Sequence, residues 1–277
     1  MTTIGKYNQL KVVKFTDFGI YLDGENFGEV LLPLRYVPEN CKLDDILDVF
    51  IYRDSEDRII ATTEKPYACV GEFAYLKVVA VNTVGAFLDW GLLKDLLVPY
   101  REQKITLEEG RSYVVYVYLD EDSQRITAST KLDKFLDKQS TEFTEGEEVD
   151  LFICNQTDIG YKAIINGTHW GVLYENEVFQ TLKRGQKIKG FIKKIREDKK
   201  IDLCLQRSGY EKVDELTEMI LAKLKEKGGY IAVTDKSPSE VIYKLFGISK
   251  KSFKMTIGAL YKKRIISMEG AGIRLIE

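Results

Sequence analysis

The chain has 277 residues, of which 44% are hydrophobic and 30% charged, with 41 Lys and Arg against 43 Asp and Glu. This length predicts two to four domains with their own cores, and the composition excludes a disordered tail. No run of about 18 apolar residues is present, and the N-terminus lacks a basic segment followed by an apolar one, so we expect neither a membrane helix nor a secretory signal.

Residue types that commonly build catalytic or metal centres are scarce. His169 is the only histidine, and beside Trp170 in a strand-rich segment we expect it to be a packing or surface residue. The four cysteines do not form the close pairs of a zinc site or a small disulfide framework: Cys41, Cys69, Cys154 and Cys204. We therefore expect a soluble cytoplasmic protein with no catalytic residue, no metal and no cofactor.

One pattern of glycines and strands occurs three times. A glycine opens a strand-like run and a second glycine follows 14 residues later, and these pairs are Gly5 with Gly19, Gly71 with Gly85, and Gly146 with Gly160. Each unit continues with a short apolar strand and then a strand pair around an acidic turn, such as 54–57 or 120–123.

About five short strands in each unit predict small closed barrels over residues 1–66, 67–138 and 139–209. The second glycine would lie where a strand bends sharply, a position at which a side chain would be costly. Ordinary β-meanders are the alternative interpretation.

The last segment, 210–277, changes to a helical period. Gly228 and Gly229 end a first helix, a strand follows at 230–233, and residues 235–238 open a second helix that Gly247 ends. Ser249 then caps a third helix, which is expected to bury Phe253, Ile257, Leu260 and Tyr261. With a β-hairpin over 265–276, this order is that of a winged helix.

Two features of the chain resemble known families. The repeated unit, with its glycine, alternating strand, aromatic-Gly-x-aromatic step and terminal Arg-Ile strand, resembles the S-one RNA-binding motif of ribosomal protein S-one, an OB-fold. Three such units followed by a short helical domain resemble the conserved virulence factor B family over essentially the whole chain. The most specific marks are Lys-Asp-Leu-Leu-Val-Pro at 94–99 and Gly-Ile-Ser-Lys-Lys-Ser-Phe-Lys at 247–254.

The resemblance implies a mainly β chain of three tandem five-stranded OB-fold barrels, followed by an α+β winged-helix domain. It also implies RNA binding in bacteria and an influence on gene expression. In the motif, the aromatic-Gly-x-aromatic pair forms a platform on which unpaired bases stack.

The first unit keeps both rings of the motif and the second keeps one, whereas the third has Ile159 and Lys162 in their place. We predict that five aromatic side chains contact RNA: Phe18, Tyr21, Phe87, Tyr161 and Tyr174. Packing of these rings against a loop or a neighbouring barrel is the alternative.

Charge is distributed unevenly along the chain. The net charge runs −4, −2, 0 and +4 over segments 1–66, 67–138, 139–209 and 210–277. In the third unit, strand parity predicts a cationic face that holds Lys187, Lys189 and Lys193. A solvated strand edge guarded by lysines is the alternative.

The third helix of the winged helix and the residues just after it carry six cations: Lys250, Lys251, Lys254, Lys262, Lys263 and Arg264. In a helix-turn-helix the second helix enters the major groove. Lysines chiefly contact phosphates, so we predict backbone affinity with little base readout, although a structural or protein-docking role is the alternative.

These observations predict a non-catalytic RNA-binding protein that holds single-stranded RNA by ring stacking and lysine contacts, in post-transcriptional regulation. The main alternative is a DNA-binding transcription regulator that acts through the winged helix, with the barrels as a sensor or dimerisation module. A nuclease that uses Asp44, Asp45 and Asp48 is a third hypothesis, although a solvated turn explains these acids more simply. The expected partners are single-stranded RNA, DNA at the winged helix and a second copy of the chain, but no membrane.

Overall fold

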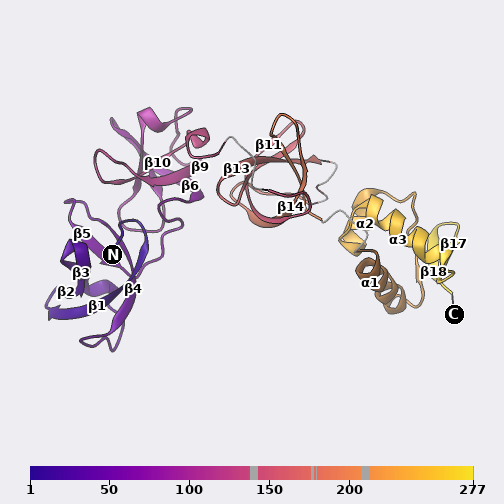
Figure 1. Ribbon diagram of the computed structural model, residues 1–277, viewed down its shortest axis with the longest axis horizontal. Helices are drawn as coiled ribbons and strands as arrows, with labels where there is room; N and C mark the ends of the chain where they lie inside the picture. The colour runs from indigo at the N-terminus through magenta and orange to yellow at the C-terminus, as the bar shows by residue number, and fades with distance from the viewer. Residues whose placement is uncertain (138–142, 176–177, 179, 207–211, 277) are drawn as a thin grey trace. The chain divides into compact units, whose positions relative to one another are not determined.

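The computed structural model describes residues 1–137, 143–175, 178, 180–206 and 212–276 (Figure 1). The chain divides into two compact units, residues 1–136 and residues 137–277. The domain boundaries predicted at 138/139 and 209/210 lie outside the described residues.

The first unit begins with a closed five-stranded barrel. Its elements are β1 (Tyr7–Thr16), β2 (Gly19–Asp23), η1 (Glu25–Phe27), β3 (Glu29–Pro33), η2 (Leu34–Tyr36), β4 (Ile46–Arg53) and β5 (Ile59–Thr62), where η denotes a 3-10 helix. The strand order is β1-β2-β3-β5-β4, and the only parallel pair recorded in it joins β3 to β5.

The second and third barrels repeat this strand order. The second contains β6 (Phe73–Val81), β7 (Gly85–Asp89), β8 (Leu96–Pro99), η3 (Tyr100–Glu102), β9 (Ser112–Leu119), β10 (Ile126–Ser129) and, after the last strand, η4 (Leu132–Lys134). The third contains β11 (Glu148–Thr157), β12 (Gly160–Ile165), β13 (His169–Tyr174), β14 (Lys187–Ile195) and β15 (Ile201–Cys204). The predicted tandem OB-fold barrels are therefore confirmed.

The second glycine of each repeat has the role that its spacing predicts. A Cβ placed on Gly19, Gly85 or Gly160 would lie only 2.1–2.3 Å from a backbone carbonyl oxygen of the neighbouring strand. Each first strand also carries a bulge at the equivalent place, between Val12 and Lys14 in the first barrel. Since a bulge bends its strand, the two features together curve the β1–β2 hairpin and its equivalents into a barrel.

The first two barrels share a hydrophobic core. Phe50 of β4 is fully buried and its ring lies 5.8 Å from that of Trp90, which follows β7. Tyr52 and Ile60 of the first barrel belong to the same cluster as the core of the second. This shared core holds the two barrels together as one unit.

The C-terminal elements form the predicted winged helix. They are α1 (Lys212–Glu226), β16 (Tyr230–Ile231), α2 (Ser239–Phe246), α3 (Lys250–Lys262), β17 (Ile266–Glu269) and β18 (Gly272–Leu275), and the sheet order is β16-β18-β17. Gly247 ends α2 at φ +67°, and the Ser249 hydroxyl accepts the Ser252 amide at 3.0 Å as the cap of α3.

One predicted core position of α3 is wrong. Phe253, Ile257 and Leu260 are buried, but Tyr261 is 54% exposed. Successive helical residues lie about 100° apart, so the residue after Leu260 falls outside the buried stripe. By contrast, His169 is buried as a packing residue, with its ring 5.0 Å from that of Phe143.

Candidate nucleic-acid interface

The first barrel presents an open aromatic pair on the β1–β2 hairpin. Phe18 is 58% exposed, and its ring lies edge to face with that of Tyr21, 6.2 Å between centroids. Tyr21 pairs directly with Lys14 of β1, whose Nζ is 5.6 Å from the Tyr21 ring centroid. The Lys14 ammonium therefore lies beside the Tyr21 ring, and the neighbouring Phe18 ring is open to solvent.

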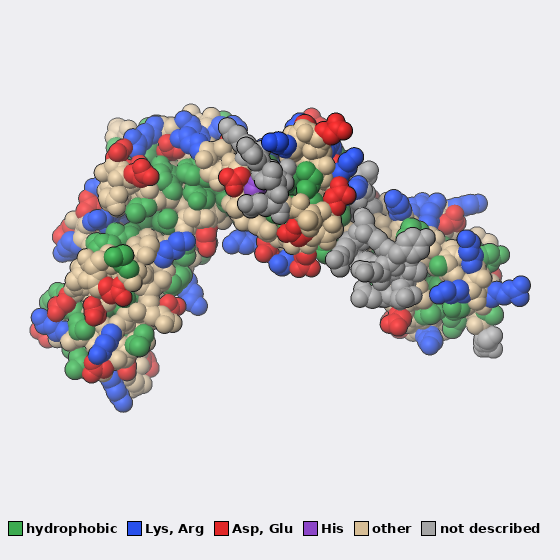
Figure 2. Space-filling model, in the orientation of Figure 1, with side chains coloured by type: hydrophobic (Ala, Val, Ile, Leu, Met, Phe, Trp, Pro, Cys, Tyr) green, Lys and Arg blue, Asp and Glu red, His purple; other side chains and the backbone are tan. Residues whose placement is uncertain are grey.

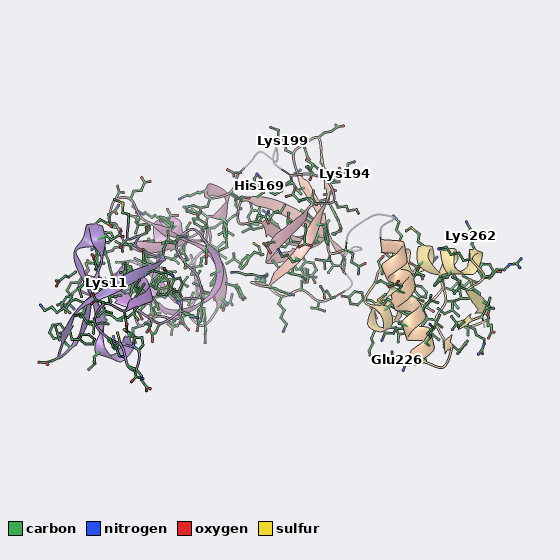
Figure 3. The ribbon with its side chains drawn as sticks, turned by 60° about the horizontal axis from the view of Figure 1, so that its bottom comes forward. Lys11, His169, Lys194, Lys199, Glu226 and Lys262 are labelled. Carbon is green, nitrogen blue, oxygen red and sulfur yellow. The ribbon has the colours of Figure 1, made fainter. Side chains whose placement is uncertain are left out.

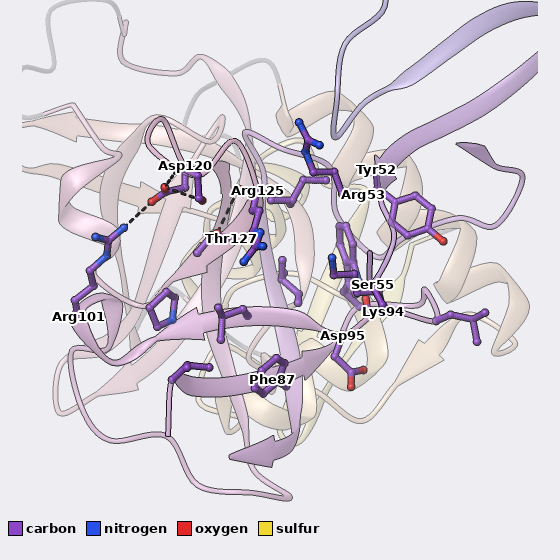
Figure 4. A pocket seen from close by; sticks show the side chains of 18 residues that line it. Tyr52, Arg53, Ser55, Phe87, Lys94, Asp95, Arg101, Asp120, Arg125 and Thr127 are labelled. Carbon is purple, nitrogen blue, oxygen red and sulfur yellow. Dashed lines mark hydrogen bonds and ion pairs between the residues drawn. The ribbon is translucent and has the colours of Figure 1, made fainter. Parts of the chain in front are cut away.

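In the second barrel, Phe87 has the place of Tyr21. The register pairs Phe87 with Ala80 and Leu97, as it pairs Tyr21 with Lys14 and Leu31. Phe87 is half-buried and lines a hollow between the two barrels of this unit, opposite residues of β4 and the β4–β5 turn (Figure 4).

Polar contacts join the two barrels beside this hollow. Arg53 donates from Nε to the Gln124 carbonyl at 3.1 Å, and Lys94 Nζ donates to the Asp54 carbonyl at 2.5 Å. Arg125 donates from Nε to Asp57 at 3.0 Å and pairs with it through a second nitrogen. The hydrogen bond from Arg125 is the main reason that the pKa of Asp57 lies below its usual value.

At the other side of the hollow, Arg101 pairs with Asp120 at 2.7 Å (Figure 4). Backbone and side-chain hydrogen bonds from Ser123, followed by Arg101, lower the pKa of Asp120. The basic side chains of this hollow were not predicted, because they are isolated in the sequence and no run of charge marks them.

The third barrel corrects one predicted RNA contact. Tyr161 is 9% exposed and belongs to the barrel core. It occupies the position of Ile20 and Ala86, which are buried in the other barrels. Strand alternation explains this, because the residue directly after the motif glycine points inward.

The outer face of the third barrel carries two rings that have cations of their own. Lys162 Nζ lies 3.6 Å from the centroid of Trp170, and the Arg196 guanidinium lies 5.6 Å from that of Tyr174 and bonds its hydroxyl. Trp170 was not predicted as a site residue, although alternation along β13, with residues 169, 171 and 173 buried, would have placed it outside.

The lysines of β14 do not form one uniform face. Lys187 and Lys189 are exposed, but Lys189 is paired with Asp150 at 2.8 Å. A bulge lies between Ile192 and Lys194, so Lys193 does not continue the alternation that the prediction assumed. Lys194 and Lys199, which were not predicted as site residues, both lie on the upper side of this barrel in the view of Figure 3.

The winged helix concentrates cations on α3 and the residues after it. Lys251, Lys254 and Lys262 are exposed on the helix, whereas Lys250 is half-buried. Lys263 and Arg264, which directly follow the helix in the chain, are also exposed. Lys and Arg side chains are prominent on the visible face of this domain in Figure 2, and Lys262 lies on its outer surface in Figure 3. Met255 and Tyr261 interrupt this face with apolar surface.

Two of the three acids of the nuclease hypothesis have structural partners. Asp44 pairs with Lys11 at 2.6 Å, and Asp45 accepts the Lys42 amide at 2.7 Å. In the described part of the chain, no group of three or more His, Cys, Asp and Glu residues is arranged to hold a metal ion.

Comparison with known families matches two kinds of domain. Residues 4–64 and 70–131 match the S1 domain, and residues 218–275 match the CvfB-like winged helix domain. The S1 matches fall on the first two barrels, and the winged-helix match falls on the C-terminal helices and hairpin.

The chain is also similar to complete proteins over nearly its whole length. It is 28% identical to the uncharacterized protein YitL of Bacillus subtilis, over 96% of this chain and 91% of that protein. It is 24% identical to conserved virulence factor B of Staphylococcus epidermidis, over 98% and 94%. A multidomain protein with nucleic acid binding domains from Streptococcus pneumoniae is 21% identical over 99% of this chain and 98% of that one, with a TM-score of 0.41.

S1-type barrels in tandem, followed by a winged helix, define a class of nucleic-acid-binding proteins, and this chain has that role. Within that class, the chain is similar to the conserved virulence factor B proteins, and its last domain matches the CvfB-like winged helix. Among the helices of the described residues, none has the length and apolar character needed to cross a membrane.

Proposed function

We propose that the protein binds single-stranded RNA without catalysis, in the cytoplasm, and acts in post-transcriptional regulation of gene expression. The observation that carries this proposal is the open ring pair of Phe18 and Tyr21 with Lys14 beside it. Unpaired bases stack on such rings, whereas a duplex hides its base faces. Cations beside the rings would contact the phosphates of the same strand.

In this proposal four segments make different contacts with the RNA: 1–66, 67–138, 139–209 and 210–277. Phe18, Tyr21 and Phe87 contact bases in the first two segments, and Tyr174 contributes in the third. Lys187 and the cations of α3 contact phosphates. Tyr161 is left out because it is buried.

The test is a titration of labelled oligo-U RNA, single-stranded DNA of equal length and duplex DNA across a salt series. We expect the chain to prefer RNA, and the Phe18→Ala/Tyr21→Ala double variant to lose roughly 1–3 kcal/mol for each base that no longer stacks. The matched control is Leu43→Ala/Ile46→Ala, which truncates two other exposed apolar side chains of the same barrel. Equal binding by the two double variants would refute stacking on the first barrel.

A second candidate function is duplex DNA binding through α3, which the exposed lysines of that helix favour. It predicts a preference for duplex DNA that the Phe18→Ala/Tyr21→Ala variant does not change. Substitution of Lys251 and Lys254 would abolish it instead.

A further inference from the structure

The hollow between the first and second barrels has the size and composition of a binding site. Its volume is about 650 Å³, within the roughly 300–1,000 Å³ that ligand sites span. The lining combines apolar side chains, among them Val84, Phe87 and Leu97, with Arg53, Arg101 and Arg125. Phe87 lies at one end of the hollow, and the three arginines lie away from it (Figure 4).

The walls of the hollow are held in place before any ligand binds. Three residues of the lining make contacts between the barrels: Trp90 with Phe50, Arg53 with the Gln124 carbonyl and Lys94 with the Asp54 carbonyl. A preformed site loses less conformational entropy on binding than a site that must assemble around its ligand.

The charge of the hollow is opposite to that of the segments that build it. Residues 1–138 carry more acids than bases, yet the described residues lining the hollow include four basic and two acidic side chains. Arg101 and Arg125 each pair with one carboxylate and remain more than half exposed. Since a guanidinium has five N–H donors, each can bind a phosphate oxygen while it keeps its carboxylate partner.

We propose that a short segment of single-stranded RNA crosses this hollow, with one base stacked on Phe87 and the neighbouring phosphate bound by Arg101 and Arg125. The inference rests on the proposed RNA-binding function and assigns to it a composite site that neither barrel forms alone. A duplex would not fit this description, because its bases present no free face to Phe87.

The test measures oligo-U RNA affinity of the full-length protein across a salt series for Arg101→Gln and Arg111→Gln. These two arginines are matched, because both lie in the second barrel, each pairs with one carboxylate, and their side chains are 64% and 68% exposed. Only Arg101 lines the hollow. We expect Arg101→Gln to weaken binding about tenfold and to reduce the slope of log K against log salt by about 0.7, while Arg111→Gln changes neither.

A second variant, Phe87→Leu, keeps the apolar volume and removes the ring. It should weaken binding about five- to hundredfold without changing the salt slope. If Arg101→Gln binds like Arg111→Gln, or Phe87→Leu binds like the wild type, the composite site is refuted while RNA binding stands. If the wild type does not bind RNA, the proposed function itself fails. If uridine monophosphate occupies the hollow as tightly as the oligonucleotide does, its ligand is a free nucleotide and not a strand.

Discussion

The first and third barrels present different chemistry at the same backbone position. In the first, Tyr21 lies opposite Lys14 on the β1–β2 hairpin, and in the third, Lys162 lies opposite Asn155 on β11–β12. Both hairpins have a bulge in the first strand and the same close approach at the motif glycine. The backbone is therefore shared, while the outward side chains differ.

Barrel closure and ligand recognition therefore depend on separate sets of residues. The rings of the third barrel already contact its own cations, Lys162 over Trp170 and Arg196 over Tyr174. A base that stacks on either ring must compete with a cation–π contact of about 0.5–2 kcal/mol. Tyr21 of the first barrel also has a cation nearby, Lys14 at 5.6 Å, but Phe18 beside it is 58% exposed, so we expect Phe18 to make the first barrel stack bases more strongly.

The largest effect is expected on stability, at the motif glycine that the first and third barrels share. Gly160→Ala should lower the free energy of unfolding by roughly 2–5 kcal/mol, because its Cβ would meet the Leu173 carbonyl oxygen at 2.1 Å in addition to the backbone strain of a positive φ. Gly146→Ala is the control, since its φ is +86° but no atom lies within 4 Å, and it should cost only about 1–2 kcal/mol. Urea unfolding combined with hydrogen exchange over β11–β15 measures both, and equal losses would contradict this account of the glycine.

The next largest effect is expected on RNA affinity, when the outward residue of the first barrel is replaced by its equivalent in the third. Tyr21→Lys gives the first barrel the chemistry of the third and should weaken single-stranded RNA binding by about 1–3 kcal/mol. The measurement belongs at high salt, where the added positive charge contributes least. Tyr75→Lys, at another exposed tyrosine, is the control and should leave affinity unchanged. If Tyr21→Lys also leaves affinity unchanged, the first barrel does not stack bases.

A smaller effect separates ring contacts from charge contacts. The Lys251→Gln/Lys254→Gln/Lys262→Gln variant removes three exposed cations of α3. It should reduce the salt slope of single-stranded RNA binding by about 2, since each lost phosphate contact accounts for about 0.7. The control is Lys225→Gln/Lys227→Gln at the end of α1 and just after it. A slope that is unchanged in the α3 variant would assign the winged helix to another partner.

The smallest effect concerns acid stability. Burial by itself would raise the pKa of Glu102, but hydrogen bonds from Lys134 and Ser129 outweigh it and hold the pKa below its ordinary value of 4.5. The carboxylate therefore stabilises the second barrel above about pH 4.5, and this contribution is lost as the pH falls through the lowered pKa. Glu102→Gln should make Tm fall less between about pH 5 and pH 3, because carboxylates titrate in roughly this range. Glu108→Gln, at an exposed position, should leave that decline as in the wild type.

Several elements were predicted correctly because their signals are local. The 14-residue glycine spacing marked the three barrel hairpins, and Ser249 and Gly247 marked the limits of α3 and α2. The errors at Tyr161 and Tyr261 concern which way a side chain faces. Tyr161 was predicted to face solvent and is buried, whereas Tyr261 was predicted to be buried and is exposed. In each case the adjacent residue has the predicted environment, so an error of one position exchanges core and solvent.

The repeat, the three barrels, the winged helix and the aromatic character of the first hairpin follow from the sequence alone, because each depends on residues that are near neighbours along the chain. Which rings are open, which have cations beside them, and where the basic hollow lies depend on how the chain folds. Arg125 and Asp57 meet across 68 positions of sequence, and Phe87 and Arg53 line one hollow because the two barrels pack together through contacts such as that of Phe50 with Trp90. Such sites depend on the packing of one barrel against another, which no local pattern of residues records.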